Sequence, residues 1–378
     1  MITHLSYPPG NSINDFIDPS NSTVQYTSFD EVIQSISMVG QASLLGKMDI
    51  KSAFRLLRVR PEDFQLLGIS FQDKYYIDKC LPFGCAISCN LFEKFATFLE
   101  WVIKSRTGVT TIHHYLDDFI FIGDQQSTQC HTLMNNFKSM CLDLGIPLND
   151  SKTEGPCTSL VFLGLEIDTI AQTIKVPQDK LNDLKDLLTK LSKLQKTTLK
   201  DLQSLVGKLN FVTKAIHGSR AFNRRFYTAT IGVRKPPHFI RITSPLKEDI
   251  KLWLKFLGYF NGTAYFQEIE WTSNSTLHLY TDSAGNPELG CGTVFGSQWV
   301  ALKWPKAWAN DQIIKDITFL ELVPIVLAMY IWNPLLRNKR ILFHIDNMAL
   351  VNIVNSQSSK SALVMSFLRP LVLLPNGK

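Results

Sequence analysis

The chain has 378 residues, too many for one ordinary hydrophobic core, so two or three domains are expected. Hydrophobic residues make up 45% of the sequence and charged residues 19%, which excludes an intrinsically disordered protein. The net charge of +6, from 39 basic and 33 acidic residues, suits a polyanionic partner if the excess is concentrated on one face.

Cysteine usage and the N-terminal residues predict an intracellular protein, in the cytoplasm or the nucleus. The seven cysteines are an odd number, and they form neither a CxxC pair nor a His/Cys cluster with zinc-finger spacing. The start of the sequence has no apolar signal-peptide segment. Residues 322–332 are apolar, but the run is short and contains Pro324, so it predicts a buried helix and no membrane span.

In chain order, residues 1–30 are rich in Pro, Asn, Ser and Asp and predict loops and turns. A mixed α/β region follows, and its clearest element is a hairpin. The β-rich runs 111–115 and 119–122 flank a short acidic turn that contains Asp117. His113 and His114 are neighbours on the first run, and adjacent strand residues point to opposite faces. We therefore interpret both histidines as structural.

Past Pro177 the pattern becomes helical and basic. Leucines recur at helical spacing between residues 181 and 194, and Thr198 can cap a second helix with Asp201 at its N3 position. A cluster of arginines interleaved with aromatic residues suits phosphates and stacked bases. Its members are Arg220, Arg224, Arg225, Phe222, Phe226 and Tyr227. This region is either an arm that holds a nucleic-acid duplex or a plain helical linker.

Near residue 276 the pattern changes again to α/β. The predicted elements are strands over 276–281, 291–295 and 341–345, and a helix over 317–332. Two of these strands run directly into an acid, Asp282 and Asp346, and the helix carries Glu321 among apolar residues. Trp299, Trp304 and Trp308 are expected to pack in the core of this region.

Paired acids are the first chemical signal of the sequence. Phosphoryl transfer to a primer 3′-hydroxyl uses two divalent metal ions, and magnesium prefers hard oxygen ligands. Asp117 and Asp118 place two carboxylates on a hairpin tip, where a cation would relieve their repulsion. Because Asp is common in turns, this pair alone is weak evidence.

Five motifs in order resemble those of reverse transcriptases. They are Lys47-Met48-Asp49-Ile50-Lys51-Ser52-Ala53-Phe54, Leu81-Pro82-Phe83-Gly84 with Ser88, Asn90 and Phe92, Tyr115-Leu116-Asp117-Asp118, Leu148-Asn149-Asp150-Ser151-Lys152-Thr153, and Phe162-Leu163-Gly164-Leu165. The order of five motifs is far more specific than any single one. The resemblance implies that Asp49 and Asp117 bind both Mg²⁺ ions (Mn²⁺ being an alternative), with Asp118 beside them.

The same resemblance implies a dNTP pocket of four residues: Phe54, Phe83, Gly84 and Lys152. Phe54 would be the steric gate that clashes with a ribose 2′-hydroxyl, and core packing is its alternative role. Gly84 would let the backbone approach the nucleotide or template closely. Lys152 would steady the departing pyrophosphate, with a solvated lysine as the alternative.

The acids of the last region resemble the first three catalytic carboxylates of RNase H. They are Asp282 in Tyr280-Thr281-Asp282-Ser283, Glu321 in Phe319-Leu320-Glu321-Leu322 and Asp346 in His344-Ile345-Asp346-Asn347. The resemblance implies that all three are metal ligands, used for two-metal hydrolysis of the RNA strand in an RNA–DNA hybrid.

Further segments resemble the DIRS-type, or tyrosine-recombinase, class of retrotransposons. They are Leu5-Ser6-Tyr7-Pro8 with Ser12-Ile13-Asn14-Asp15, Asp78-Lys79-Cys80-Leu81-Pro82, Ile87-Ser88-Cys89, and Leu202-Gln203-Ser204-Leu205-Val206-Gly207-Lys208-Leu209-Asn210-Phe211. The implied architecture combines α/β and α+β domains. It has reverse-transcriptase fingers and palm over 1–170, a helical thumb or connection over 171–275, and an RNase H-like domain over 276–378. The family continues at both ends, with basic strands before residue 5 and a fourth RNase H carboxylate on a later helix. We therefore expect a truncated copy.

The leading hypothesis is an RNA-directed DNA polymerase with an attached RNase H-like domain. Its partners would be an RNA or DNA template, a DNA primer, an RNA–DNA hybrid and dNTPs, without membrane association; the sequence leaves the oligomeric state open. An alternative is a catalytically inactive nucleic-acid-binding remnant of such an element. A DDE-type nuclease or transposase built on the latter half would not explain Tyr115-Leu116-Asp117-Asp118 and its flanking motifs.

Overall fold

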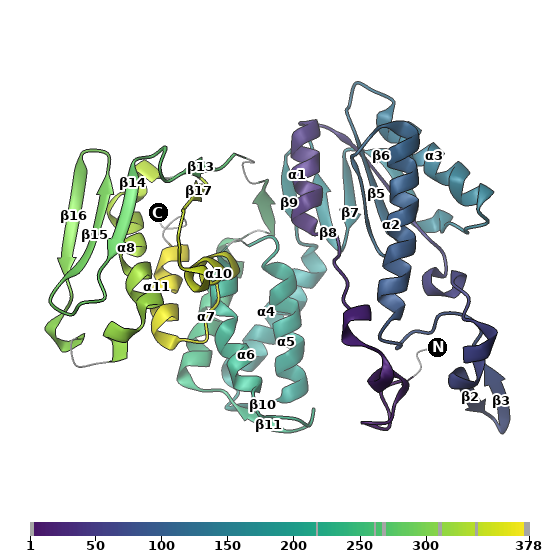
Figure 1. Ribbon diagram of the computed structural model, residues 1–378, viewed down its shortest axis with the longest axis horizontal. Coiled ribbons are helices and arrows are strands. Elements are labelled where there is room, and N and C mark those ends of the chain that lie inside the picture. Colours follow the sequence, from purple (N-terminus) through teal and green to yellow (C-terminus); the bar gives the residue numbers. More distant parts are fainter. Residues whose placement is uncertain are drawn as a thin grey trace. The chain divides into compact units, whose positions relative to one another are not determined.

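The computed structural model describes residues 4–216, 218–260, 262–266, 270–308, 312–336 and 339–373, and it divides the chain into two compact units (Figure 1). The first unit comprises residues 1–175 and the second residues 176–378. The predicted separation of a helical region from an RNase H-like domain at residue 275 falls inside the second unit and stays a prediction. In the described part of the chain, no helix is long and apolar enough to cross a membrane.

The first unit is built on an antiparallel sheet with the strand order β4-β5-β1-β6. Its helices and strands are α1 (Phe29–Val39), β1 (Leu44–Asp49), β2 (Gly68–Phe71), β3 (Lys74–Ile77), α2 (Ser88–Thr107), β4 (Ile112–Tyr115), β5 (Asp118–Gly123), α3 (Gln129–Asp143), β6 (Glu154–Cys157), β7 (Ser159–Phe162), β8 (Leu165–Asp168) and β9 (Thr173–Lys175). Strands β7, β8 and β9 form a second antiparallel meander, and β2 and β3 form a hairpin.

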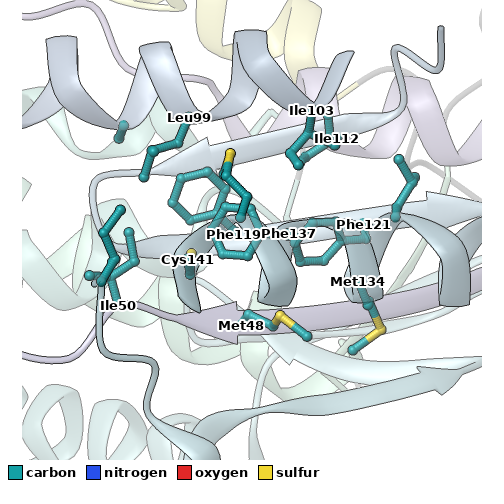
Figure 2. Close-up of a cluster of buried hydrophobic side chains, with 14 of the residues drawn as sticks. Met48, Ile50, Leu99, Ile103, Ile112, Phe119, Phe121, Met134, Phe137 and Cys141 are labelled. Atoms are coloured by element: carbon teal, nitrogen blue, oxygen red, sulfur yellow. The ribbon is translucent and has the colours of Figure 1, made fainter. Parts of the chain in front are cut away.

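The two central strands are buried because helices pack on the sheet. In β5, residues 119–123 are all buried, as expected for a strand that is covered on both faces. Phe119 and Phe121 pack against Phe137 of α3, with ring centroids 4.4 and 5.3 Å apart (Figure 2). The apolar side of α2, which includes Leu99 and Ile103, completes this core.

The predicted hairpin is confirmed. β4 and β5 pair from Ile112↔Phe121 to Tyr115↔Asp118, so that only Leu116 and Asp117 form the turn. Leu116 adopts a φ of +54°, a left-handed conformation that is unfavourable for a leucine. Strain of this kind is maintained only when the surrounding structure holds the residue in place.

The second unit combines helices with a small sheet. Its elements are α4 (Gln178–Lys193), β10 (Lys196–Thr198), α5 (Leu199–Val212), α6 (Arg224–Thr230), β11 (Phe239–Arg241), α7 (Ser244–Tyr259), β12 (Thr263–Tyr265), β13 (Thr272–Ser273), β14 (Leu279–Ser283), β15 (Gly290–Phe295), β16 (Gln298–Lys303), α8 (Ile317–Ile331), α9 (Asn333–Leu336), β17 (Ile341–Leu342), α10 (Met348–Ser356) and α11 (Ala362–Leu373). As predicted, the Thr198 hydroxyl caps α5 and accepts a hydrogen bond from the backbone N–H of Asp201 at 3.1 Å.

The antiparallel sheet β14-β15-β16 is covered by α8, which agrees with the predicted α/β layout of this region. Two strand predictions were wrong in their extent. The first strand begins at Leu279 because residues 274–278 form a turn, and the last strand ends at Leu342 and pairs in parallel with β13. The prediction for Trp299 was also wrong: Trp304 is buried, whereas the Trp299 side chain is 73% exposed on β16.

Candidate active site

The first acidic cluster forms where the end of β1 lies beside the start of β5. Asp49 is the last residue of β1, Asp118 is the first of β5, and the two are Cα partners in the antiparallel ladder. The backbone N–H of Ile50 donates to the carbonyl oxygen of Asp117 at 3.0 Å, which ties the hairpin tip to the end of β1. Residues 68 positions apart in sequence, 49 and 117, therefore meet at one edge of the sheet.

The loop before β6 surrounds the Asp49 carboxylate. The ammonium group of Lys152 lies 2.8 Å from Oδ2 of Asp49, and the side-chain amide of Asn149 donates to Oδ1 at 3.2 Å. The Asp49 side chain is only 4% exposed, whereas that of Lys152 is 58% exposed. Lys152 is thus the counterion of a buried carboxylate. The resemblance to reverse transcriptases implies that this same lysine lies near the triphosphate.

Burial, together with electrostatic repulsion, raises the pKa values of Asp117 and Asp118. Burial raises the pKa of Asp118 to about 6, with further increases from the charges of Asp117 and Asp49 and a hydrogen bond to Asp49. Burial and the charge of Asp49 also raise the pKa of Asp117. Lys152 opposes both shifts. Three carboxylates with one lysine leave excess negative charge, so a cation is favoured here.

The donor set of this cluster fits a magnesium ion that also binds a substrate. Within the described ranges, no three acidic, histidine or cysteine side chains are arranged to hold a metal ion by themselves. Magnesium is usually held by one or two carboxylates together with substrate phosphates, rather than by a complete cage of protein ligands. Asp49, Asp117 and Asp118 would supply those carboxylates.

Replacing Asp118 with asparagine should stabilise the first unit. Because the folded protein raises the pKa of Asp118 from 3.8 to about 6, ionisation destabilises the fold, and this cost is fully present above pH 6. We expect Asp118→Asn to raise the free energy of unfolding by about 1–2 kcal/mol at pH 7, allowing for partial solvent screening. Thermal unfolding without divalent ions measures this, and the gain should vanish near pH 4. If the Tm of Asp118→Asn at pH 7 were equal to or lower than that of the wild-type protein, ionised Asp118 would not destabilise the fold.

Three of the four proposed dNTP-pocket residues, Phe54, Phe83 and Gly84, lie close to one another, whereas Lys152 contacts Asp49. Phe54 is 8% exposed, and its ring lies 4.9 Å from that of Phe83 and 5.3 Å from that of Phe92. Phe54 therefore packs in the core, its alternative role, although this contact does not test the steric-gate role. Phe83 is 38% exposed, and Gly84 has a φ of +100°, a conformation that favours glycine.

Asn14 contributes to this region in a way that the sequence analysis missed. Its side-chain amide donates to the Ser6 hydroxyl at 2.8 Å and to the Gly84 carbonyl oxygen at 2.9 Å. Its Oδ1 accepts from the backbone N–H of Ala86 at 2.9 Å. One side chain therefore holds both ends of the 84–86 loop. The only sequence signal was its place within the segment Ser12-Ile13-Asn14-Asp15.

Removing the Asn14 side chain should loosen this loop. We expect Asn14→Ala to lower the free energy of unfolding by about 1–2 kcal/mol, because three hydrogen bonds are lost at a partly exposed site. Chemical denaturation measures the change. Asn11→Ala is the matched control, since Asn11 is exposed in the same segment. Equal effects of the two replacements would contradict the role of Asn14.

The two histidines of β4 point to opposite faces, as predicted. His113 contacts the Ser35 hydroxyl of α1 at 2.7 Å, whereas His114 contacts Glu93 and Glu100 of α2. Burial lowers the pKa of His114, but the hydrogen bond to Glu100 and the nearby carboxylate of Glu93 outweigh it and raise the pKa to about 9. His114 is therefore a protonated bridge inside the protein, and its strand ends at the acidic hairpin tip.

The charges of Asp282 and Asp346 act on Glu321 of α8, although within the described ranges the three acids are not arranged to hold a metal ion by themselves. Burial raises the pKa of Glu321 on α8, and the charges of Asp346 and Asp282 raise it further. Oε2 of Glu321 is buried and has no hydrogen-bond partner among the described residues. Asp282 also borders a hollow of about 440 Å³ on the sheet. A buried carboxylate oxygen without a partner, under the influence of two other acids, is the kind of ligand that a divalent cation takes.

Comparisons with known proteins cover different shares of the chain. Residues 5–167 match the family model described as "Reverse transcriptase (RNA-dependent DNA polymerase)". Protein P of heron hepatitis B virus is 28% identical over 183 residues, which are 48% of this chain and 23% of that protein. The genome polyprotein of petunia vein clearing virus is 26% identical over 130 residues, which are 34% of this chain and 6% of the polyprotein. The chain thus spans about a quarter or less of these relatives.

Two solved structures of the foamy viral protease-reverse transcriptase share the fold. The one in complex with double-stranded DNA has a TM-score of 0.50 and 16% sequence identity, covering 93% of this chain and 59% of that one. The one in complex with an RNA/DNA hybrid has the same score and identity and covers 91% of this chain and 44% of that one.

Proposed function

We propose that this chain, which has the reverse-transcriptase fold, is an RNA-directed DNA polymerase that adds dNTPs to a primer 3′-hydroxyl. The observation that carries the proposal is the meeting of Asp49, Asp117 and Asp118 with Lys152 at one edge of the sheet. All of these residues lie inside the 5–167 segment that matches the family model.

The chain's own residues account for the parts of such a reaction. Asp49, Asp117 and Asp118 would hold Mg²⁺, or Mn²⁺, which supplies charge stabilisation to the transferring phosphoryl group when bound. The exposed ammonium of Lys152 can exchange its contact with Asp49 for a phosphate oxygen. Phe54 and Phe83 would shape the pocket for the deoxyribose, and the Gly84 backbone would approach the nucleotide.

We further propose an RNase H-like role for the second unit, in which Asp282, Glu321 and Asp346 would hold the metal ions for hydrolysis of RNA in an RNA–DNA hybrid. Their mutual electrostatic influence and the buried, unpartnered Oε2 of Glu321 support this. The DIRS-type retrotransposon origin is likewise a proposal, and it rests on segments such as Ser12-Ile13-Asn14-Asp15. Template, primer and hybrid are the proposed partners.

Primer extension tests the polymerase proposal. Purified chain, an RNA template with an annealed DNA primer, the four dNTPs and Mg²⁺ should give elongated primer, and chelation of the metal should stop it. Manganese is tested in parallel. Binding of the template–primer without any extension in either metal would refute the polymerase activity and favour the inactive nucleic-acid-binding remnant.

A further inference from the structure

A cavity of about 510 Å³ lies in the second unit, between the α6–α7 region and the start of α11. Its walls carry five cationic side chains, and none of the described residues that line it has a carboxylate. The cationic side chains are Arg224, Arg225, Arg241, Lys360 and Arg369. We call this cavity the basic pocket. Its size falls in the range of small-molecule sites.

Two of the cations are fixed in place by a buried acid. Asp249 is 2% exposed and accepts hydrogen bonds from Arg225 at 3.1 Å and from Arg369 at 2.7 Å. Arg369 also stacks on the Phe222 ring at 5.1 Å, and Arg225 lies 3.6 Å from Glu248. These contacts join α11 to α7 and hold two guanidinium groups rigidly at the wall of the pocket.

The other three cations are available to a ligand. Across the described ranges, no ion pair is formed by Arg224, Arg241 or Lys360, and Arg241 and Lys360 are exposed. With Asp249 and Glu248 offsetting two charges of the five, the pocket keeps an excess of about three positive charges. Such a concentration of charge attracts an anion.

The remaining lining suits a phosphate that carries an organic group. The N-terminal ends of α7 and α11 both border the pocket, and their positive dipole ends add to the hydroxyls of Thr243 and Ser361. Part of the wall is apolar and includes Ile240, Leu246 and Met365. A cationic rim beside an apolar wall matches a phosphate attached to a nucleoside.

We propose that the basic pocket binds the phosphate of a nucleoside phosphate, either one nucleotide of a strand or a free mononucleotide. This site is separate from the acidic cluster of the first unit and does not depend on polymerisation. The double replacement Arg241→Gln with Lys360→Gln removes two exposed charges that have no structural ion pair. Lys303→Gln with Lys306→Gln is the matched control, because both lysines are exposed in the same unit outside the pocket.

The test uses the full chain carrying Asp117→Asn, so that failure of polymerisation cannot influence the result. Affinity for a labelled single-stranded oligodeoxynucleotide is measured from about 50 to about 200 mM salt. If a strand occupies the pocket, the slope of log affinity against log salt should become shallower by about 1.4 in the Arg241→Gln, Lys360→Gln variant. Each of the two lost phosphate contacts accounts for about 0.7 of this change. The control variant should keep the wild-type slope.

A second experiment measures the affinity for dAMP by calorimetry. Deoxyadenosine, which lacks the phosphate, is the control ligand. If a free nucleotide occupies the pocket, dAMP binding should drop at least tenfold in the pocket variant while the oligonucleotide slope stays unchanged. The proposal is wrong if neither measurement changes, or if the pocket and control variants change equally. Thermal unfolding verifies that both variants are folded.

Discussion

Replacing Asp117 with asparagine is expected to lower the rate of primer extension by about 10³-fold, which corresponds to about 4 kcal/mol of lost transition-state stabilisation. Asparagine keeps the shape of the side chain but removes the charge that would hold a divalent cation beside Asp49. The Asp117 pKa is already raised by burial and by Asp49, so the folded protein should tolerate the loss of this charge. Single-turnover extension on a primed RNA template measures the effect.

Asp143→Asn is the matched control, because Asp143 lies exposed at the end of α3 in the same unit. This variant should extend primers at the wild-type rate. Asp117→Asn should still bind template–primer and should leave any hydrolysis by the second unit unchanged. If Asp117→Asn extended primers normally, the acidic cluster of the first unit would not be the catalytic centre.

The second large effect is expected from His114→Leu. This replacement leaves Glu93, which is 8% exposed, without a cationic partner, while Glu100 keeps its contact with Lys104. Removing one member of a buried ion pair costs about 3–5 kcal/mol, so we expect the first unit to lose about that much free energy of unfolding. Urea or guanidinium denaturation measures the loss.

The same residue should make stability depend on pH. Since the folded protein raises the pKa of His114 from 6.5 to about 9, its contribution is fully present below pH 6.5 and is lost as the pH rises through 9. Wild-type protein should therefore lose more stability between pH 7 and about 9.5 than His114→Leu does. Equal pH dependence in both proteins would contradict a protonated His114.

His113→Leu supplies the comparison on the opposite face of β4. Among the described residues His113 has one polar contact, with Ser35, and burial lowers its pKa, so it is not the centre of an ion pair there. We expect a loss of about 1 kcal/mol. Adding Glu93→Gln to His114→Leu should recover part of the lost stability, because the uncompensated buried charge is then removed.

Local signals in the sequence determined several features of this protein. The hairpin around Asp117 followed from two β-rich runs and a short turn, and the capping of α5 by Thr198 followed from residues three positions apart. The order of five motifs pointed to Asp49, Asp117 and Asp118, whose role as metal ligands stays a prediction. Each of these features depends on neighbouring residues or on a characteristic order of residue types, so the linear sequence contains them.

Only the tertiary structure decided which distant groups meet. The resemblance already implied that Asp49 meets Asp117 and Asp118, but the contact of His114 with Glu93 and the hydrogen bonds of Asn14 to the 84–86 loop join separate elements that no motif links. The length of a strand also depended on its partner, because the predicted strand 341–345 is paired only at residues 341–342, with β13. In the same way, Trp299 is exposed because none of the described residues covers that part of β16. The residues that pack against a side chain set its burial, and burial in turn governs its hydrogen bonding, its charge state and its pKa. The linear sequence does not show which residues those are.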